Sequence, residues 1–266
     1  MLVDAIRRAR IIPAMLALLL SVLCLSQDPA PAKPAPAAPA PAEPAAATPA
    51  KPVAAWDDKA AKEALDEWSK LPKAASMAEK NRGLERFAEG SNKLLVPPLA
   101  KVVETDKSVV LRKRAAELLG NQPAVEAGKE IRKLMKNGKI ASQPTVMAEL
   151  VRGLGRTAYD ASCWGDLERL FEAEFFVERA PLQEAILELV IAKKEKAAVP
   201  LLVRHLEEPK PTDPDSASNP PAEYWEARWK SWSIWKAKVR EALFVVTGQR
   251  FSTQAEATAW LKKNKF

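Results

Sequence analysis

The sequence is poor in the residues on which most small-molecule chemistry depends. Its 266 residues include nine glycines, two cysteines and one histidine. The glycine–lysine pairs at Gly128-Lys129 and Gly138-Lys139 lack the upstream glycine of a phosphate-binding loop. The sequence therefore predicts neither a Walker nor a dinucleotide-binding site, and we expect no bound cofactor.

Histidine and cysteine are too few for the common metal and nucleophile sites. His205 has no serine or cysteine at a recognisable catalytic spacing, so we interpret it as a surface or packing residue. A zinc site needs about three or four ligands, and we predict no metal. We therefore expect a protein that is not an enzyme. Helix-surface glutamates such as Glu207 and Glu208 are usually solvated charge, although a catalytic carboxylate pair stays open as an alternative.

Proline and basic residues are abundant instead. The chain has 22 prolines, a formal net charge of +7 and 47% hydrophobic residues. It is long enough to bury a core, while the clustered prolines indicate that one part is not globular. The positive charge favours acidic partners without selecting nucleic acid, anionic lipid or an envelope polymer.

Residues 1–26 have the pattern of a signal peptide. Arg7, Arg8 and Arg10 precede an apolar run over residues 11–25, which is shorter than the roughly 20 residues of a membrane span. Small residues at Cys24 and Ser26 place the cleavage before Gln27. We predict an exported protein, periplasmic or extracellular. The alternative is an uncleaved membrane anchor; a lipoprotein is disfavoured because Leu23 precedes the cysteine. After cleavage Cys163 is the one remaining thiol, so no intramolecular disulfide is expected.

A proline- and alanine-rich segment follows over residues 27–55. Alternating proline and alanine prevent a helical hydrogen-bond ladder and offer no side-chain face for packing. We predict a disordered spacer that holds a folded domain away from its terminus or tether.

Residues 56–266 are predicted to be an all-α domain. Ser76 followed by Glu79 forms a helix N-terminal capping box, and Leu84 and Phe87 share one helix face. No convincing alternating strand pattern is present. We predict helix pairs at 56–71 with 77–89, 92–104 with 107–119, 123–136 with 143–155, 163–174 with 180–193, and 196–208 with 222–247. A polar, proline-rich loop over residues 209–221 is predicted to be disordered, and a terminal helix begins after Ser252.

Two internal repeats support this division. The sequence VPPLAKVVE at 96–104 recurs as VPLLVRHLE at 199–207, and both are expected to be first helices of a pair. Second helices at 111–120, 146–155 and 239–248 share aliphatic residues four apart and a glycine nine residues after the first. We predict that Gly120, Gly155 and Gly248 end these helices.

The repeats resemble the HEAT-repeat family over roughly residues 92–248. The resemblance rests on Asp106 before the second helix and on a following run that matches the family pattern, namely Leu111, Arg112, Ala115, Leu118, Leu119 and Gly120, with Val239 and Arg240 in the last unit. Met147 and Glu184 stand where the family usually has arginine, and the Gly120–Gly155 spacing is shorter than the usual period of about 40 to 47. The resemblance implies a short right-handed α–α superhelix, a solenoid whose second helices line the concave surface.

Residues 224–245 combine tryptophans with bases. Trp225, Trp229, Trp232 and Trp235 fall on a stripe that continues as Val239, Leu243 and Val246. Because each buried tryptophan removes on the order of 150–250 Å² from water, we predict that this tryptophan-rich helix is core and caps the C-terminal end of the solenoid. The alternative is a partly exposed aromatic platform that binds a sugar, a lipid or a partner.

The sequence therefore predicts a non-enzymatic interaction or scaffolding module, presented on a flexible stalk to a protein partner. The alternative is an envelope-binding protein that docks on an anionic polymer or lipid through a basic surface; nucleic acid is not the expected partner. Candidate partner-binding residues are Lys113 and Arg152, which lie opposite the aliphatic stripes of their helices, and Trp225 and Trp229.

Overall fold

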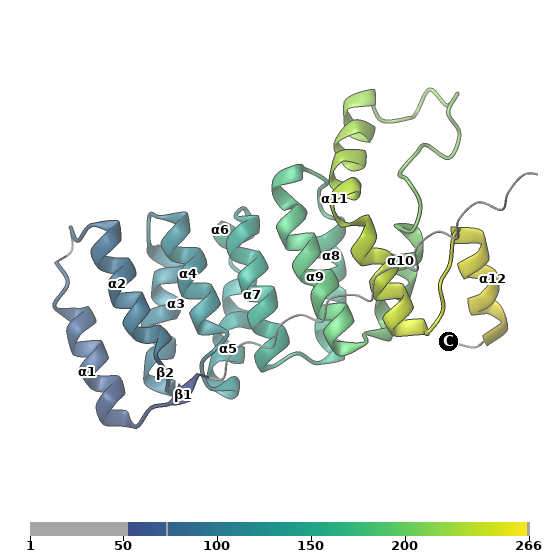
Figure 1. Cartoon of the computed structure of the whole chain (residues 1–266). Helices are drawn as coiled ribbons and strands as arrows, with labels where there is room; N and C mark the ends of the chain where they lie inside the picture. Colours follow the sequence, from purple (N-terminus) through teal and green to yellow (C-terminus); the bar gives the residue numbers. More distant parts are fainter. Residues whose placement is uncertain (1–52, 73, 265–266) are drawn as a thin grey trace, which may run out of the picture. The chain divides into compact units, whose positions relative to one another are not determined.

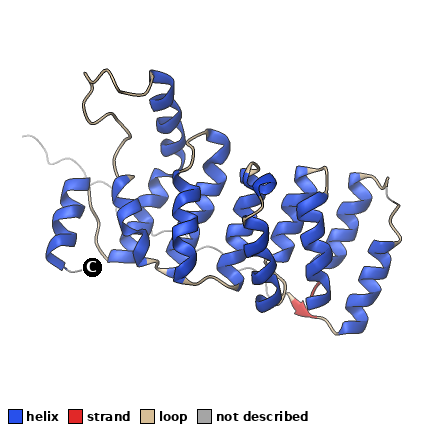
Figure 2. Ribbon diagram, turned by 180° about the vertical axis from the view of Figure 1, so that it is seen from behind, coloured by secondary structure: helices blue, strands red, loops and turns tan. Residues whose placement is uncertain are grey.

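The computed structural model describes residues 53–72 and 74–264, and helices make up almost all of their regular structure (Figures 1 and 2). The predicted signal peptide and the predicted spacer up to residue 52 lie outside the described residues. Within the described residues, no helix is both long enough and apolar enough to cross a membrane.

The helices form five consecutive pairs and one terminal helix, as the sequence predicts. In each pair the first and second helix contact each other. The pairs are α1 (Asp58–Ser69) with α2 (Met77–Ala88), α3 (Val96–Thr105) with α4 (Val109–Leu119), α5 (Ala124–Met135) with α7 (Pro144–Thr157), α8 (Trp164–Glu172) with α9 (Ala180–Lys193), and α10 (Val199–Arg204) with α11 (Ala222–Thr247). The short α6 (Gly138–Ala141) lies inside the third pair, and α12 (Gln254–Asn264) follows the fifth.

Successive second helices pack side by side. Helix α2 contacts α4, α4 contacts α7, α7 contacts α9, and α9 contacts α11, an order that can be followed in Figure 1. These contacts bury one continuous core, because each helix pair has apolar residues on more than one side. A pair at any point in the series therefore depends on its neighbours for burial.

Local sequence signals begin the helices. The predicted capping box is present. The Ser76 hydroxyl accepts a hydrogen bond from the Glu79 amide at 3.2 Å, and the Glu79 carboxylate accepts one from the Ser76 amide at 2.8 Å. Three first helices follow a short 3₁₀ turn, namely η1 (Lys93–Leu95), η2 (Ala161–Cys163) and η4 (Lys196–Ala198). Each turn is capped by a side-chain oxygen that accepts the backbone amide two residues later, from Asn92, Asp160 and Glu195 respectively.

Two arginines bind the C-terminal ends of first helices, one from the second helix α4 and one from the 3₁₀ turn η3 (Val177–Arg179) that precedes α9. Arg112 donates from Nε to the carbonyl oxygen of Val103 at 2.6 Å, and Arg179 donates from Nη2 to that of Leu170 at 2.9 Å. Both arginines are buried and lie nine residues after their acceptor. They satisfy carbonyl groups that a helix end leaves without an intrahelical partner.

The glycines do not all have the predicted role. Gly120 and Gly248 cap the ends of α4 and α11, and Gly248 has φ of 75°, which favours glycine. Gly155 does not end α7, which continues to Thr157. A Cβ atom on Gly120 would lie 2.6 Å from the Cα atom of Gly153. The absent side chain at Gly120 thus lets α7 approach the end of α4 closely.

A two-residue strand pair that the sequence did not predict lies at the start of the domain. Strand β1 (Ala54–Ala55) pairs in parallel with β2 (Gly90–Ser91), and the Trp56 amide donates to the carbonyl oxygen of Ser91 at 3.0 Å. The side chain of Trp56 covers Gly90, where an added Cβ atom would lie 2.0 Å from the indole ring. The last two residues of the predicted spacer are therefore attached to the helical domain.

The fifth pair is interrupted by the loop over residues 209–221, as the sequence predicts. Most of its side chains are exposed, and the Asn219 amide donates to the carbonyl oxygen of Asp213 at 2.7 Å. Disorder of this loop stays a prediction. The first part of α11 extends beyond the neighbouring α9 (Figure 1).

The packing of α4 gives a direct test of the predicted faces. Leu118→Asp places a carboxylate at a position that is 2% exposed, and Val110→Asp makes a comparable aliphatic-to-acid change on the same helix at a position that is 64% exposed. We expect Leu118→Asp to lower the free energy of unfolding by more than about 3 kcal/mol and Val110→Asp to change it by less than about 0.5 kcal/mol. Urea denaturation measures both, and equal losses would contradict the assigned faces.

Candidate functional site

A ladder of ion pairs crosses four second helices and includes two of the predicted partner-binding residues. Lys113 on α4 lies 3.8 Å from Glu149 on α7, and Arg152 on α7 bonds Glu149 at 3.1 Å and Glu188 on α9 at 2.8 Å. Lys238 on α11 then bonds Glu188 at 2.5 Å. The same ammonium group also lies 3.6 Å from Glu184.

The carboxylates of the ladder compensate the positive charges of its three bases. Partial burial opposes the charge of Arg152, but the hydrogen bonds that it donates to Glu188 and Glu149 raise its pKa. Burial raises the pKa of Glu188, yet Arg152 and Lys238 together hold it below its usual range. Lys113 and Arg152 are therefore brought into one network with acids that the sequence reasoning did not select. One of these acids could have been noticed in the sequence, because Glu184 stands where the HEAT-repeat pattern usually has arginine.

The four clustered tryptophans have different environments. Trp232 and Trp235 are buried, 7% and 0% exposed, which confirms the core prediction for these two. Trp229 is 45% exposed, and the same prediction is wrong there. At about 100° of rotation per helical residue, Trp229 lies roughly 120° around α11 from Trp235. Its side chain consequently points away from the face that contacts α9.

Trp225 is half-buried and lines a pocket at the base of the loop. The pocket has a volume of about 480 Å³ and is formed by the end of α10, the first loop residues and the start of α11. The Arg228 guanidinium lies 3.8 Å from the centre of the Phe175 ring, and the Tyr224 ring packs edge-on against Trp225. The contact of Arg228 with Phe175 attaches the first turns of α11 to the residues before α9.

Three buried side chains connect α9 to the buried part of α11 through hydrogen bonds. The Gln183 side-chain oxygen accepts hydrogen bonds from the Ser231 hydroxyl and from the Trp235 indole N–H, each at 2.9 Å. The Gln183 amide nitrogen donates to the carbonyl oxygen of Phe171 at 3.2 Å. Since all three side chains are completely buried, this network fixes the rotation of α11 about its axis.

His205 is a packing residue, as expected. Its ring lies 5.3 Å from that of Phe171 and 5.4 Å from that of Trp235, and its Nε2 atom is 3.0 Å from a carboxylate oxygen of Glu172. Its backbone carbonyl accepts the Trp232 indole N–H at 2.9 Å. Among the described residues, no group of three or more His, Cys, Asp or Glu side chains is placed to hold a metal ion.

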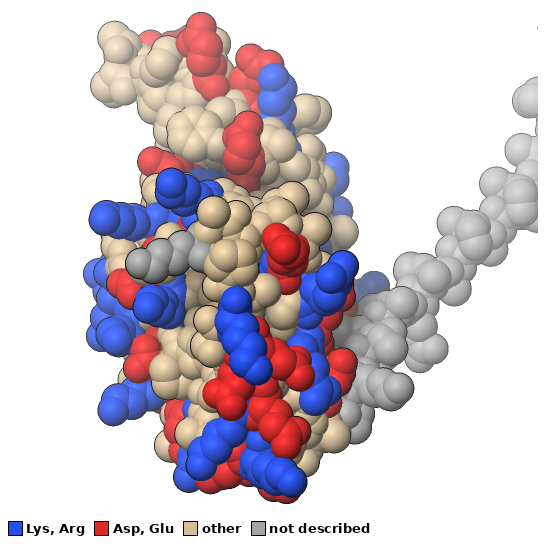
Figure 3. All heavy atoms as spheres, turned by 90° about the vertical axis from the view of Figure 1, so that its left-hand side faces the viewer, with Lys and Arg blue, Asp and Glu red and all other residues tan. Residues whose placement is uncertain are grey.

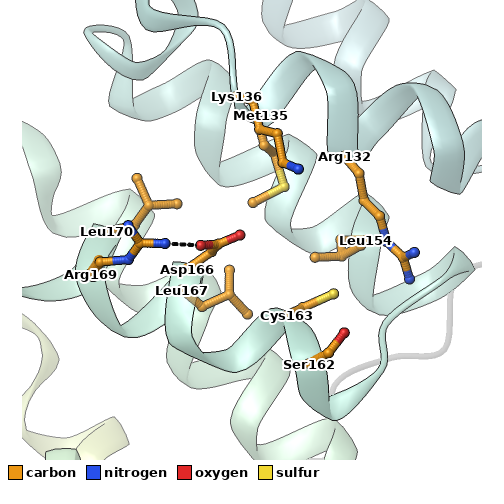
Figure 4. A pocket seen from close by; sticks show the side chains of 10 residues that line it. All are labelled: Arg132, Met135, Lys136, Leu154, Ser162, Cys163, Asp166, Leu167, Arg169 and Leu170. Carbon is orange, nitrogen blue, oxygen red and sulfur yellow. Dashed lines mark hydrogen bonds and ion pairs between the residues drawn. The ribbon is translucent and has the colours of Figure 1, made fainter.

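A further pocket opens between the first helices α5 and α8 (Figure 4). It has a volume of about 740 Å³, and the apolar part of its lining includes Leu154 and Leu167. The cationic side chains of Arg132, Lys136 and Arg169 stand around it, with Asp166 paired to Arg169. Arg132 is likewise paired, with Asp160 at 2.6 Å, so two of the three cations at this pocket are compensated.

Comparison with protein-family models, with curated proteins and with solved structures finds no match for this chain. The geometry described above is therefore the basis for the functional conclusion.

The two classes of tryptophan make a stability prediction. We expect Trp235→Ala to lower the free energy of unfolding by about 3–5 kcal/mol, because it leaves a large cavity and removes a partner of Gln183. Trp229→Ala should cost less than about 1 kcal/mol, since much of its side chain is already in water. Urea denaturation followed by circular dichroism measures both. A loss at Trp229 as large as that at Trp235 would show that α11 is rotated from its described position.

The Glu172 carboxylate predicts a pH effect. Burial raises its pKa, but hydrogen bonds and charge from His205 and Arg204 prevail and hold it at about 2, below its ordinary 4.5. A lowered folded-state pKa stabilises the fold above pH 4.5, and this contribution is lost as the pH falls toward 2. Glu172→Gln should therefore reduce stability at pH 7 and flatten the decline between pH 4.5 and 2. Glu168→Gln, which also removes a partner of Arg204, is the control and should keep the decline.

Proposed function

We propose that this protein is an exported, non-enzymatic interaction module, a HEAT-like right-handed solenoid that binds a protein partner. The observation that carries the proposal is the position of its exposed apolar side chains. Five of the nine large apolar side chains that are exposed among the described residues belong to α11 or to the turn before α9, namely Phe176, Val177, Tyr224, Trp229 and Ile234. That turn contacts α11.

Exposed aromatic and aliphatic residues around one helix favour a protein interface. Aromatic side chains are enriched at the centres of such interfaces, and concentrated apolar exposure marks binding surfaces. The ion-pair ladder supports the same conclusion, because it compensates the charges of Lys113 and Arg152 that an anionic polymer would need. The proposed partner surface is therefore α11 with the residues before α9.

One observation favours the envelope-binding alternative. Lys129 on α5, Lys136 directly after α5 and Lys139 on α6 are exposed, and none of their ammonium groups pairs with a carboxylate of a described residue. Three exposed, unpaired lysines close together in sequence attract anionic polymers or lipid headgroups, and salt screens this attraction.

Affinity capture of the native partner by the mature chain, with chemical cross-linking, tests the proposal. We expect a cross-linked protein whose capture changes little between about 0.15 and 0.5 M salt, because an apolar interface is weakly screened. A double variant, Phe176→Ser with Tyr224→Ser, should reduce capture by about tenfold or more. The control Val125→Ser removes a side chain that is more exposed still, on the distant α5, and should leave capture unchanged.

The opposite results would reject this function. Recovery of polymer or lipid without protein, lost at the higher salt and reduced by Lys129→Glu with Lys136→Glu, would establish the envelope-binding alternative. Capture of protein that Phe176→Ser with Tyr224→Ser does not reduce would place the interface elsewhere.

A further inference from the structure

The row of second helices stops at α11 without a successor among the described residues. Each earlier second helix, from α4 to α9, packs between a preceding and a following one. Helix α12, which follows α11, instead packs against α10, the first helix of the last pair. Helix α12 thus has the position of a first helix. No helix of the described residues takes the next second-helix position beside α11, which we call the open place (Figure 1).

One face of α11 borders this open place. Ser231, Trp235 and Lys238 bond to α9 and define the opposite, inner side of the helix. Counting about 100° per residue, the positions farthest from α9 form a stripe with steps of four, three, four and four. We name this stripe the outer face; it consists of Trp229, Ser233, Lys236, Arg240 and Phe244.

The outer face is aromatic at both ends and basic between them. Trp229 and Arg240 are exposed, while Phe244 is half-buried beneath the guanidinium of Arg250, 4.7 Å from its ring. Neither Lys236 nor Arg240 pairs with a carboxylate of a described residue; the Lys236 ammonium lies over the Trp232 ring at 4.8 Å. The uncompensated charge of the outer face is therefore positive.

The earlier junctions show which charge the open place lacks. Base–acid pairs join α4 to α7, α7 to α9 and α9 to α11, through Lys113–Glu149, Arg152–Glu188 and Lys238–Glu188. At the outer face α11 provides only the bases of such a junction. A helix that continued the row would supply the carboxylates.

The other end of the series has a different surface. Exposed positions of α1 and α2 are charged with both signs, including Lys62 and Glu63 on α1 and Arg82 and Glu85 on α2. Figure 3, which views this end, shows acidic and basic side chains interspersed. A polar outer surface is what a repeat array needs at a solvated end. The outer face of α11, with Trp229, lacks this character.

We propose that an acidic amphipathic helix of the protein partner docks along the outer face of α11 and takes the open place in the second-helix row. This inference rests on the proposed function and names the structural class of the partner's binding segment. Trp229 and Phe244 are fifteen residues apart, so the docked helix spans about 22 Å, or four turns. Its apolar residues contact Trp229 and Phe244, and its acids pair with Lys236 and Arg240.

Selection from a displayed library of 18-residue amphipathic helices tests the proposal. The apolar stripe of the library is fixed and its flanking positions are free, so the charge of the selected sequences is a result. We expect binders to the mature chain that are enriched in Asp and Glu at the flanks. Their affinity should fall about tenfold or more with Trp229→Ala and with Arg240→Glu. Basic substitutions in a selected peptide should restore part of its binding to the Arg240→Glu chain.

Two controls make the result specific. Val125→Ser on α5 and Lys62→Glu on α1, both at exposed positions, lie away from the outer face and should leave the affinity unchanged. Circular dichroism of every variant establishes that the helices are intact. A library that yields no binder, binders without acidic enrichment, or binders that ignore both Trp229→Ala and Arg240→Glu would each overturn the proposal.

A photo-crosslinking residue at Ser233, in the middle of the outer face, separates this inference from the proposed function. We expect it to cross-link to a helical segment of the captured partner. If the native partner is captured but Ser233 does not cross-link to it, the docking site is wrong and the interaction function stands. If no protein is captured at all, the proposed function fails. Cross-links from Ser233 to a second copy, with dimers in sedimentation, would assign the face to self-association and overturn the acidic-helix proposal.

Discussion

The structure depends on one constraint: a helix pair of this size cannot bury its apolar residues without a neighbouring pair. Leu118 and Leu119 near the end of α4 are both buried, although α4 alone presents them on different parts of its surface. Helices α3 and α7 both contact α4, and the absence of a side chain at Gly120 allows α7 to come close. Repetition of this requirement along the chain produces the ordered series of pairs.

Polar contacts orient particular helices within the series. Arg112 and Arg179 satisfy the ends of first helices, and Gln183 holds the buried side of α11 through Ser231 and Trp235. Apolar packing alone tolerates some rotation, whereas a buried hydrogen bond loses its geometry within a small angle. The rotation of α11 in turn decides which tryptophans are buried and which are exposed.

The same constraint explains why the proposed partner surface lies at one end. In the middle of the series both sides of a second helix are covered, and the ion-pair ladder compensates the charges between them. At the end, α11 has one covered side and one that no described element covers as a second helix would. Burial of exposed apolar surface is favourable. A further helix that packs on this side would therefore gain binding free energy by covering the exposed aromatic residue and by pairing acids with the unpaired bases. The interaction proposal and its partner class both follow from this asymmetry.

The sequence by itself determined where the helices lie, because helix signals are local. Periodic apolar residues, the Ser76–Glu79 capping box and the recurring valine–proline starts at 96 and 199 are all read within a few residues. They predicted the five pairs, the interruption before α11 and the terminal helix. The burial of Trp235, Leu118 and Phe87 followed from the same periodicity.

Only the tertiary structure decided contacts between residues that are distant in sequence. Arg152 and Glu188 are 36 residues apart, and Ala54 pairs with a strand that begins at Gly90; no local pattern encodes either contact. The glycines of α7 illustrate the same limit. The repeat spacing predicted a structural role for Gly155, whereas the glycine that packs closely against Gly120 is Gly153. The exposure of Trp229 depends on how far α11 turns and extends relative to α9. That rotation is fixed by Gln183, 46 residues before Trp229, through contacts that exist only once the helices have packed.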